Sequence, residues 1–257
     1  EGAVFVLFAL RCAQPQCWSL PLLPFLNFAM LGLAAALLHR LVRLRHSPLV
    51  AALAVLLFVS NGSLFGYTRF VMAEVWTLPF LLGAALAFFH ADKEPRRYLA
   101  CALLLSLSFL FHYAGAIVGI AFALALLLHR RPALATRWPW IALLAALPLP
   151  VLWLVIRALH NRSGRNIHAI ERLVQPSFDN LGYYAVATAA LLGIAVIPLY
   201  LAGFSRLVLV RGNRISPWAQ SVLFPLLSLA LFFTLVYHWA DKRFLYYLFP
   251  FAVAVGA

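Results

Sequence analysis

Charged side chains are scarce in this chain of 257 residues. Asp, Glu, Lys and Arg together make up 11% of it, and only seven residues are acidic. Hydrophobic residues make up 65%, and the mean hydropathy is +0.95. A water-soluble domain of this size could not bury so much apolar surface. The composition therefore argues against a soluble globular protein and predicts an all-α, polytopic integral membrane protein.

Several motifs of soluble enzymes are also missing. The chain has no glycine-rich phosphate loop, Walker-type lysine or Gly-x-Ser-x-Gly elbow, which argues against nucleotide hydrolysis and serine hydrolysis. Only three cysteines occur, and an oxidising compartment would allow a disulfide between Cys12 and Cys17. No histidine or further cysteine stands near that pair at metal-ligand spacing, so a zinc site is not expected. We expect no cofactor, and the need for a divalent metal stays open.

Long apolar stretches recur along the chain, and about 20 mostly apolar residues suffice for a helix to cross a bilayer. We predict spans near 21–39, 48–66, 74–90, 98–113, 114–128, 138–157, 184–204 and 217–238. A shorter apolar run, 244–257, closes the sequence. The prediction is a single transmembrane domain, 1–257, with about eight to nine helices. Since the chain opens on Glu1 rather than Met and closes inside an apolar run, we expect a fragment with at least one further helix at each end.

Basic residues set the predicted orientation. They gather in four short connections, near 40–45, 93–97, 130–137 and 206–214, and the positive-inside tendency makes these cytoplasmic. The net charge of +13 then follows from topology and from anionic lipid headgroups, so no nucleic-acid partner is expected. The outer-face segments become 1–20, 65–74, 158–183 and 239–243. Five of the seven acidic residues lie there: Glu1, Glu74, Glu171, Asp179 and Asp241.

Two groups of outer residues could provide an acid or a base. Glu1 precedes a short apolar run, and a carboxylate just above the membrane could act as general base towards a hydroxyl; the alternative is a solvated terminal charge. Arg69 and Glu74 stand at the mouth between two spans. Charges this close to hydrocarbon are costly unless they face the bundle interior or extend to the headgroups. We therefore consider both a functional and an anchoring interpretation of this pair.

A third group could bind phosphate. Lys242 and Arg243 lead directly into an aromatic run that contains Tyr246, and a guanidinium group binds phosphate oxygens in a fork. The alternative is an ordinary basic and aromatic anchor at the membrane interface. His112 and Tyr113, in the turn between two spans, are a fourth candidate, for which a satisfied interfacial histidine is the competing interpretation.

The order of these groups resembles that of the GT-C glycosyltransferases, such as protein O-mannosyltransferases and the aminoarabinose transferase of lipid A. Glu1-Gly2 is similar to the tail of their acidic pair in the first outer loop. Arg69 followed by Glu74 is similar to their outer-mouth Arg and acid. The run 243–250, Arg-Phe-Leu-Tyr-Tyr-Leu-Phe-Pro, is similar to their late Arg-Tyr-Leu-Leu-Pro run, with Phe in place of the usual Tyr. The first acid of the pair would precede Glu1, so the main base could lie upstream.

The resemblance implies a membrane glycosyltransferase that moves a sugar from a polyprenyl phosphate to a hydroxyl acceptor on a lipid, glycan or protein. It implies that Glu1 belongs to the base site, that Lys242 and Arg243 hold the donor phosphate with Tyr246 beside them, and that Arg69 and Glu74 shape the pocket. The expected location is a bacterial inner membrane, with the active face in the periplasm or outside.

Two other classes stay open. A secondary transporter or lipid flippase would also be apolar, basic and multi-spanning, but such proteins place ionisable residues near the bilayer midplane and show internal repeats. Here the middles of the predicted spans carry almost no charge. A membrane scaffold without activity is the third option, and the gathering of acids and arginines on one face disfavours it.

Overall fold

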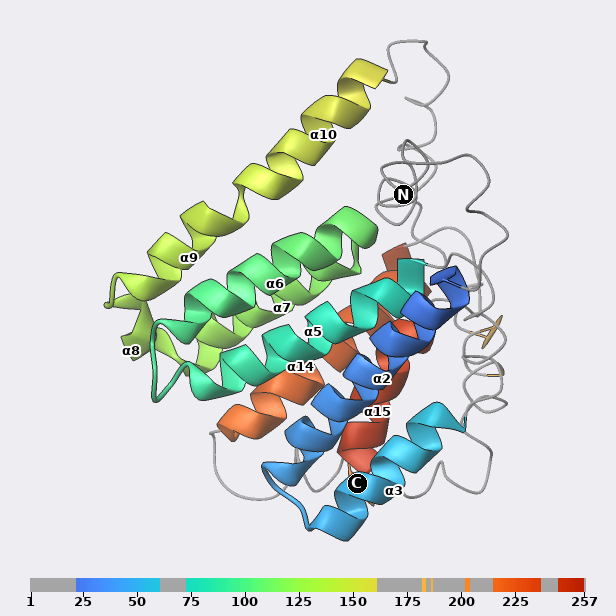
Figure 1. Ribbon diagram of the computed structural model, residues 1–257. Coiled ribbons are helices and arrows are strands. Elements are labelled where there is room, and N and C mark those ends of the chain that lie inside the picture. Colours follow the sequence, from blue (N-terminus) through green and yellow to red (C-terminus); the bar gives the residue numbers. More distant parts are fainter. Residues whose placement is uncertain are drawn as a thin grey trace.

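The structure is a computed structural model that describes residues 22–60, 73–160, 182–183, 186, 202–203, 215–236 and 245–256. Every regular element in these ranges is a helix (Figure 1). The predicted all-α, polytopic membrane bundle is confirmed. The helices are α2 (Leu22–Arg43), α3 (Pro48–Val59), α5 (Ala73–His90), α6 (Arg97–Phe111), α7 (Ala114–His129), α8 (Arg131–Leu134), α9 (Trp138–Ala146), α10 (Pro148–His160), α14 (Pro217–Leu231), the π-helix η3 (Phe232–Val236) and α15 (Leu245–Gly256).

Most of the predicted spans coincide with helices to within a few residues. The span predicted at 48–66 corresponds to α3, which ends at Val59, and its remainder past Ser60 lies outside the described residues, as does nearly all of 184–204. One predicted span is interrupted. The stretch 138–157 forms two consecutive helices, α9 and α10, which meet at Leu147. The break occurs there because Pro148 and Pro150 lack the amide hydrogen that would continue the hydrogen bonding of α9.

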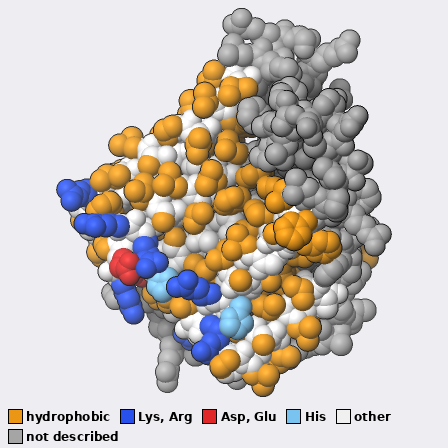
Figure 2. Space-filling model, in the orientation of Figure 1, with side chains coloured by type: hydrophobic (Ala, Val, Ile, Leu, Met, Phe, Trp, Pro, Cys, Tyr) orange, Lys and Arg blue, Asp and Glu red, His pale blue; other side chains and the backbone are white. Residues whose placement is uncertain are grey.

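Helix α5 lies at the centre of the bundle, in contact with α2, α6, α7, α14 and α15. Its side chains are buried nearly all round, as Leu78, Leu82 and Phe88 illustrate, since α5 has neighbours on every side. Peripheral helices instead expose apolar side chains, such as Leu53 on α3 and Leu144 on α9. The visible described surface is mostly hydrophobic (Figure 2), as a protein surrounded by lipid requires.

Some of the helices are long enough to cross a membrane, and others are shorter. Two described segments, Phe25–Arg43 and Pro217–Leu235, are long and apolar enough to span a bilayer on their own. Other apolar helices are shorter; α6, for example, has 15 residues and would rise about 22 Å at 1.5 Å per residue. Short helices are compatible with a bilayer that thins locally or with neighbours that cover their ends.

Helices α6 and α7 form a tight antiparallel pair. Residue His112, at the end of α6, is extended, and the chain turns directly into α7. A Cβ atom added at Gly115 would lie 2.6 Å from the carbonyl oxygen of Leu105 and 2.7 Å from the amide nitrogen of Phe109. Only glycine permits backbones to approach this closely, so Gly115 fixes the packing of the two helices just behind the turn.

Candidate functional site

The two ends of the bundle differ in charge. We call one the arginine-rich end, made of the connections 43–48, 90–97 and 129–138 and the first turn of α14. Contacts hold these segments together: Arg130 reaches Asp92 at 2.9 Å and the carbonyl of Pro217 at 3.3 Å, and the indole of Trp218 donates to the carbonyl of Leu41 at 2.8 Å. Figure 2 shows the basic side chains gathered along this margin. Three of the four connections predicted to share a side therefore do so; the fourth, 206–214, lies outside the described residues.

We call the other end the Glu74 end, where α2, α5 and α15 begin and where the α6–α7 turn and η3 lie (Figure 1). Glu74, in the first turn of α5, is buried at 7% exposure. Thr77, one turn further along α5, is fully buried. A carboxylate in the first turn of a helix lies near the positive end of the helix dipole, which makes this a favourable place for an acidic side chain.

A buried amide lies in the neighbouring helix. Asn27, near the start of α2, is fully buried and accepts a hydrogen bond of 2.7 Å from the indole Nε1 of Trp76. The indole in turn stacks on Phe111, at 5.8 Å between ring centroids. Asn27, Glu74 and Thr77 thus supply polar groups to the Glu74 end from two adjacent helices, within an otherwise apolar environment.

Aromatic side chains from three further segments meet at the same end. The imidazole of His112 stacks on Tyr247 at 4.7 Å and lies 3.8 Å from the ring of Tyr113. Phe233 of η3 stacks on Tyr247 at 6.0 Å. This cluster joins the α6–α7 turn, the π-helix and the start of α15. A single π-helical turn inside a helix is rare and frequently marks a functional site.

The structure brings two of the six predicted site residues to this end. Glu74 begins α5, and Tyr246, which is 1% exposed, lies in the first turn of α15. Both helices start at the Glu74 end and contact one another. Glu1, Arg69, Lys242 and Arg243 lie outside the described residues, as do Cys12 and Cys17. No cluster of three His, Cys, Asp or Glu side chains that could hold a metal ion occurs in the part of the chain that the structure describes.

Sequence reasoning missed Asn27, Thr77 and Trp76. A signal for Asn27 was present, because a lone amide inside an apolar span is costly to bury unless it has a partner. Thr77 stands three residues after Glu74, the helical spacing that places both on one face. The partner of Asn27 is 49 residues away in the sequence, and no local pattern could have identified it.

Comparison with known families assigns the chain. Residues 18–156, more than half of it, match the sequence model described as "Dolichyl-phosphate-mannose-protein mannosyltransferase". The chain belongs to this family. The predicted GT-C membership is therefore confirmed.

A solved structure supports the fold. The crystal structure of ArnT from Cupriavidus metallidurans bound to undecaprenyl phosphate matches with a TM-score of 0.69 at 14% sequence identity. The match covers 91% of this chain and 45% of that one, so this chain spans less than half the length of that protein. At this identity the likeness establishes the GT-C membrane fold and not the chemistry. No protein of curated function matches in sequence.

Proposed function

We propose that this chain is part of a GT-C glycosyltransferase that transfers a sugar from a polyprenyl-phosphate donor to a hydroxyl acceptor on a lipid, glycan or protein. Membership in a mannosyltransferase family carries the proposal. The similar fold of a protein solved with undecaprenyl phosphate supports the class of donor. The proposed location is a bacterial inner membrane, with the Glu74 end on the periplasmic or outer side and the arginine-rich end in the cytoplasm.

The transfer needs three groups at the reacting atoms. A carboxylate removes the proton of the acceptor hydroxyl, whose oxygen bonds to the anomeric carbon of the sugar as the bond from that carbon to the phosphate oxygen breaks. The polyprenyl phosphate leaves with the bonding electrons, and cations stabilise its charge. We assign the base site to Glu1 or to an acid upstream of it, and the phosphate contacts to Lys242 and Arg243. No cofactor is assigned.

The buried end residues shape the pocket in this proposal. Glu74 and Arg69 form its polar wall, and Tyr246 supports the donor from α15. The position of Glu74 supports this assignment: it is buried at an end where Asn27 and Thr77 add polar groups, rather than exposed to the headgroups as an anchoring charge would be. The anchoring interpretation of Glu74 is therefore the weaker one.

Steady-state transfer by the full-length protein, measured with a radiolabelled polyprenyl-phosphate sugar, tests the roles. Glu1→Gln should lower kcat by about 10²–10⁴-fold if Glu1 is the general base. Glu74→Gln should lower kcat/KM. The matched control is Glu94→Gln, because Glu94 is exposed at the arginine-rich end. Equal activities of Glu74→Gln and Glu94→Gln would contradict the role of Glu74.

The phosphate contacts require a separate experiment. Arg243→Ala should abolish transfer while expression in the membrane is unchanged, whereas Arg137→Ala, an exposed arginine at the arginine-rich end, should retain it. Undiminished turnover by Arg243→Ala would refute its role. Movement of fluorescent lipid by the purified protein without any sugar transfer would instead favour a flippase.

A further inference from the structure

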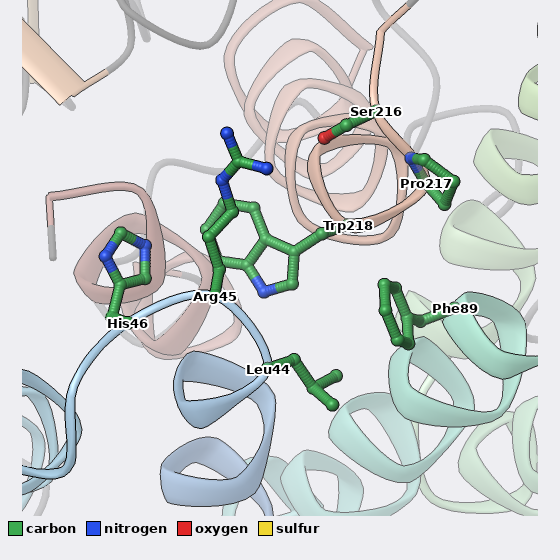
Figure 3. A pocket seen from close by; sticks show the side chains of 7 residues that line it. All are labelled: Leu44, Arg45, His46, Phe89, Ser216, Pro217 and Trp218. Atoms are coloured by element: carbon green, nitrogen blue, oxygen red, sulfur yellow. The ribbon is translucent and has the colours of Figure 1, made fainter.

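A pocket of about 450 Å³ opens at the arginine-rich end (Figure 3). It lies where the α2–α3 connection meets the first turn of α14 and the last turn of α5. Its lining residues are Leu44, Arg45, His46, Phe89, Ser216, Pro217 and Trp218. Nothing in the proposed transfer reaction uses this pocket.

One side of the pocket suits an anion. Arg45 is exposed, and its guanidinium extends towards the same space as the Ser216 hydroxyl in Figure 3. Ser216 caps α14 by accepting a 3.2 Å hydrogen bond from the amide of Ala219, so its own hydroxyl hydrogen remains to donate to a ligand oxygen. The positive end of the α14 dipole adds to the field of Arg45. Cation, hydroxyl and helix N-terminus therefore converge on one volume.

The rest of the pocket lining is mostly apolar. Leu44, Phe89 and Pro217 provide hydrocarbon surface. The indole Nε1 of Trp218 already donates to the carbonyl of Leu41, so this side chain presents ring surface, and the imidazole of His46 packs edge-on against it at 5.5 Å. A soluble phosphate would gain nothing from such a wall, whereas the glycerol backbone and first methylenes of a lipid would bury apolar surface against it.

The surrounding charge favours an anionic lipid. Both acids described at this end are already paired, Asp92 with Arg130 at 2.9 Å and Glu94 with Arg97 at 2.8 Å. The other cations described there have no acidic partner among the described residues: Arg40, Arg43, Arg45, Lys93, Arg96, Arg131 and Arg137. Basic pockets between helices at a membrane surface bind anionic headgroups, and each nearby Lys or Arg adds about 1 kcal/mol of attraction to an anionic leaflet.

We propose that this pocket binds the headgroup phosphate of an anionic phospholipid at the arginine-rich end of the bundle, with Arg45 and the Ser216 hydroxyl on the phosphate and the lipid's glycerol region against Phe89, Pro217 and Trp218. The bound lipid bridges the α2–α3 connection to α14 and stabilises their packing. The site is separate from the proposed transfer site and does not depend on that function.

Native mass spectrometry of the full-length protein, titrated with phosphatidylglycerol or phosphatidylcholine in detergent, tests the proposal. Phosphatidylglycerol should bind more tightly than phosphatidylcholine, and Arg45→Ala should weaken the tight site roughly tenfold or more, as expected for loss of a charge-assisted contact. Arg45→Lys should retain part of the affinity, because the charge remains without the fork. The matched control, Arg137→Ala, removes an equal charge away from the pocket and should change affinity less than about twofold.

A thermal unfolding assay provides a second measurement. Phosphatidylglycerol should raise the Tm of the unmodified protein and of Arg137→Ala more than that of Arg45→Ala, since a ligand stabilises only the state that binds it. If Arg45→Ala and Arg137→Ala reduce the stabilisation by phosphatidylglycerol equally, the proposal is overturned, because equal reductions would indicate a general attraction of the anionic lipid to the basic surface. Displacement of phosphatidylglycerol by millimolar inorganic phosphate, with the same dependence on Arg45, would identify a soluble phosphate as the ligand and also overturn it.

Discussion

Replacing Arg130 is expected to destabilise the bundle more than replacing any exposed arginine at the same end. The Arg130 side chain is only 4% exposed and ties three segments together. Its Nε donates to the Gln220 amide oxygen at 2.6 Å, its Nη1 donates to the Phe88 carbonyl at 2.8 Å, and it pairs with Asp92 at 2.9 Å. The guanidinium also lies 4.1 Å from the centroid of the Phe88 ring.

The magnitude follows from what each substitution leaves behind. Arg130→Met keeps the volume but leaves the Gln220 amide oxygen and the Phe88 carbonyl without their buried donor, and each unsatisfied group costs about 1–3 kcal/mol. Asp92 is 35% exposed, so water partly solvates it and its lost ion pair adds little. We therefore expect a total loss of about 2–5 kcal/mol. Arg130→Lys keeps the charge but cannot reach Asp92, Phe88 and Gln220 together, so we expect a smaller loss of about 1–3 kcal/mol.

The free energy of unfolding of the detergent-solubilised protein, obtained by titration with sodium dodecyl sulfate, measures these losses. Arg131→Met is the matched control, because Arg131 is the next residue and is exposed, and within the described ranges its side chain donates to just one group, the Leu127 carbonyl at the end of α7. We expect it to stay within about 0.5 kcal/mol of the unmodified protein. Similar stabilities of Arg130→Met and Arg131→Met would refute the assigned role of Arg130.

Asp92 provides an independent check through pH. Burial raises the pKa of Asp92, and the Arg130 guanidinium opposes that shift. In Arg130→Met the opposing charge is gone, so the pKa of Asp92 should rise further. A carboxyl whose pKa is higher in the folded state makes folding less favourable as pH rises through that pKa. The variant should therefore lose more stability than the unmodified protein over this range, and Asp92→Asn in the same background should remove the difference.

Three further predictions concern single contacts. Gly115→Ala should cost about 1–3 kcal/mol in the same unfolding assay, because the added Cβ meets the backbone of α6. The control Gly32→Ala should be neutral or stabilising, because its Cβ would meet nothing within 4 Å. Equal effects of the two substitutions would contradict the tight α6–α7 packing. Arg97 donates to Glu94 and lowers the pKa of this exposed carboxylate. The small stabilisation by this pair should therefore be present above the pKa of unfolded glutamate and be lost as pH falls through the lowered pKa. If a Glu94→Gln variant keeps the same dependence of stability on pH, the pair is not the source of that dependence. The Ser106 hydroxyl lies 2.8 Å from the last carbonyl of α9 and 2.9 Å from the Ala102 carbonyl of its own helix, so its one hydrogen is shared between two acceptors. Ser106→Ala should cost about 0.6 kcal/mol, the average for such bonds between membrane helices. A loss above about 2 kcal/mol would show that the bond to α9 holds that helix in place.

The sequence predicted what depends on local composition. Apolar length located the helices, and the arginines located one end of the bundle, because hydrophobicity and charge act residue by residue. The break at Pro148 was overlooked although its signal was present. By contrast, Arg130 was interpreted only as a topology signal, since its partners Phe88, Asp92 and Gln220 lie 38 to 90 residues away in the chain. Burial of an arginine at a helix end cannot be inferred without those partners.

The sequence was sufficient to predict where the candidate site lies, but not most of the residues that form it. Glu74 and Tyr246 were identified because their motifs are similar to those of a known family, and both helix starts indeed lie at one end. The π-helical turn and the ring cluster around His112 depend on tertiary packing between segments more than 100 residues apart, such as His112 and Tyr247. Hydropathy treats those aromatic residues as ordinary lipid-facing or core positions, so their convergence could only be found in three dimensions.

The division between the two ends suggests why the cations are distributed as they are. At the arginine-rich end, Arg130 is committed to holding helices together and Arg97 to Glu94, which leaves exposed arginines such as Arg45 available to lipid. At the Glu74 end the described residues supply a buried acid and aromatic surface but no cation with a described side chain. A phosphate bound there would need positive charge from elsewhere in the chain, and Arg69, Lys242 and Arg243 are adjacent in sequence to the helix starts that form this end. The proposed function thus depends most on these three residues.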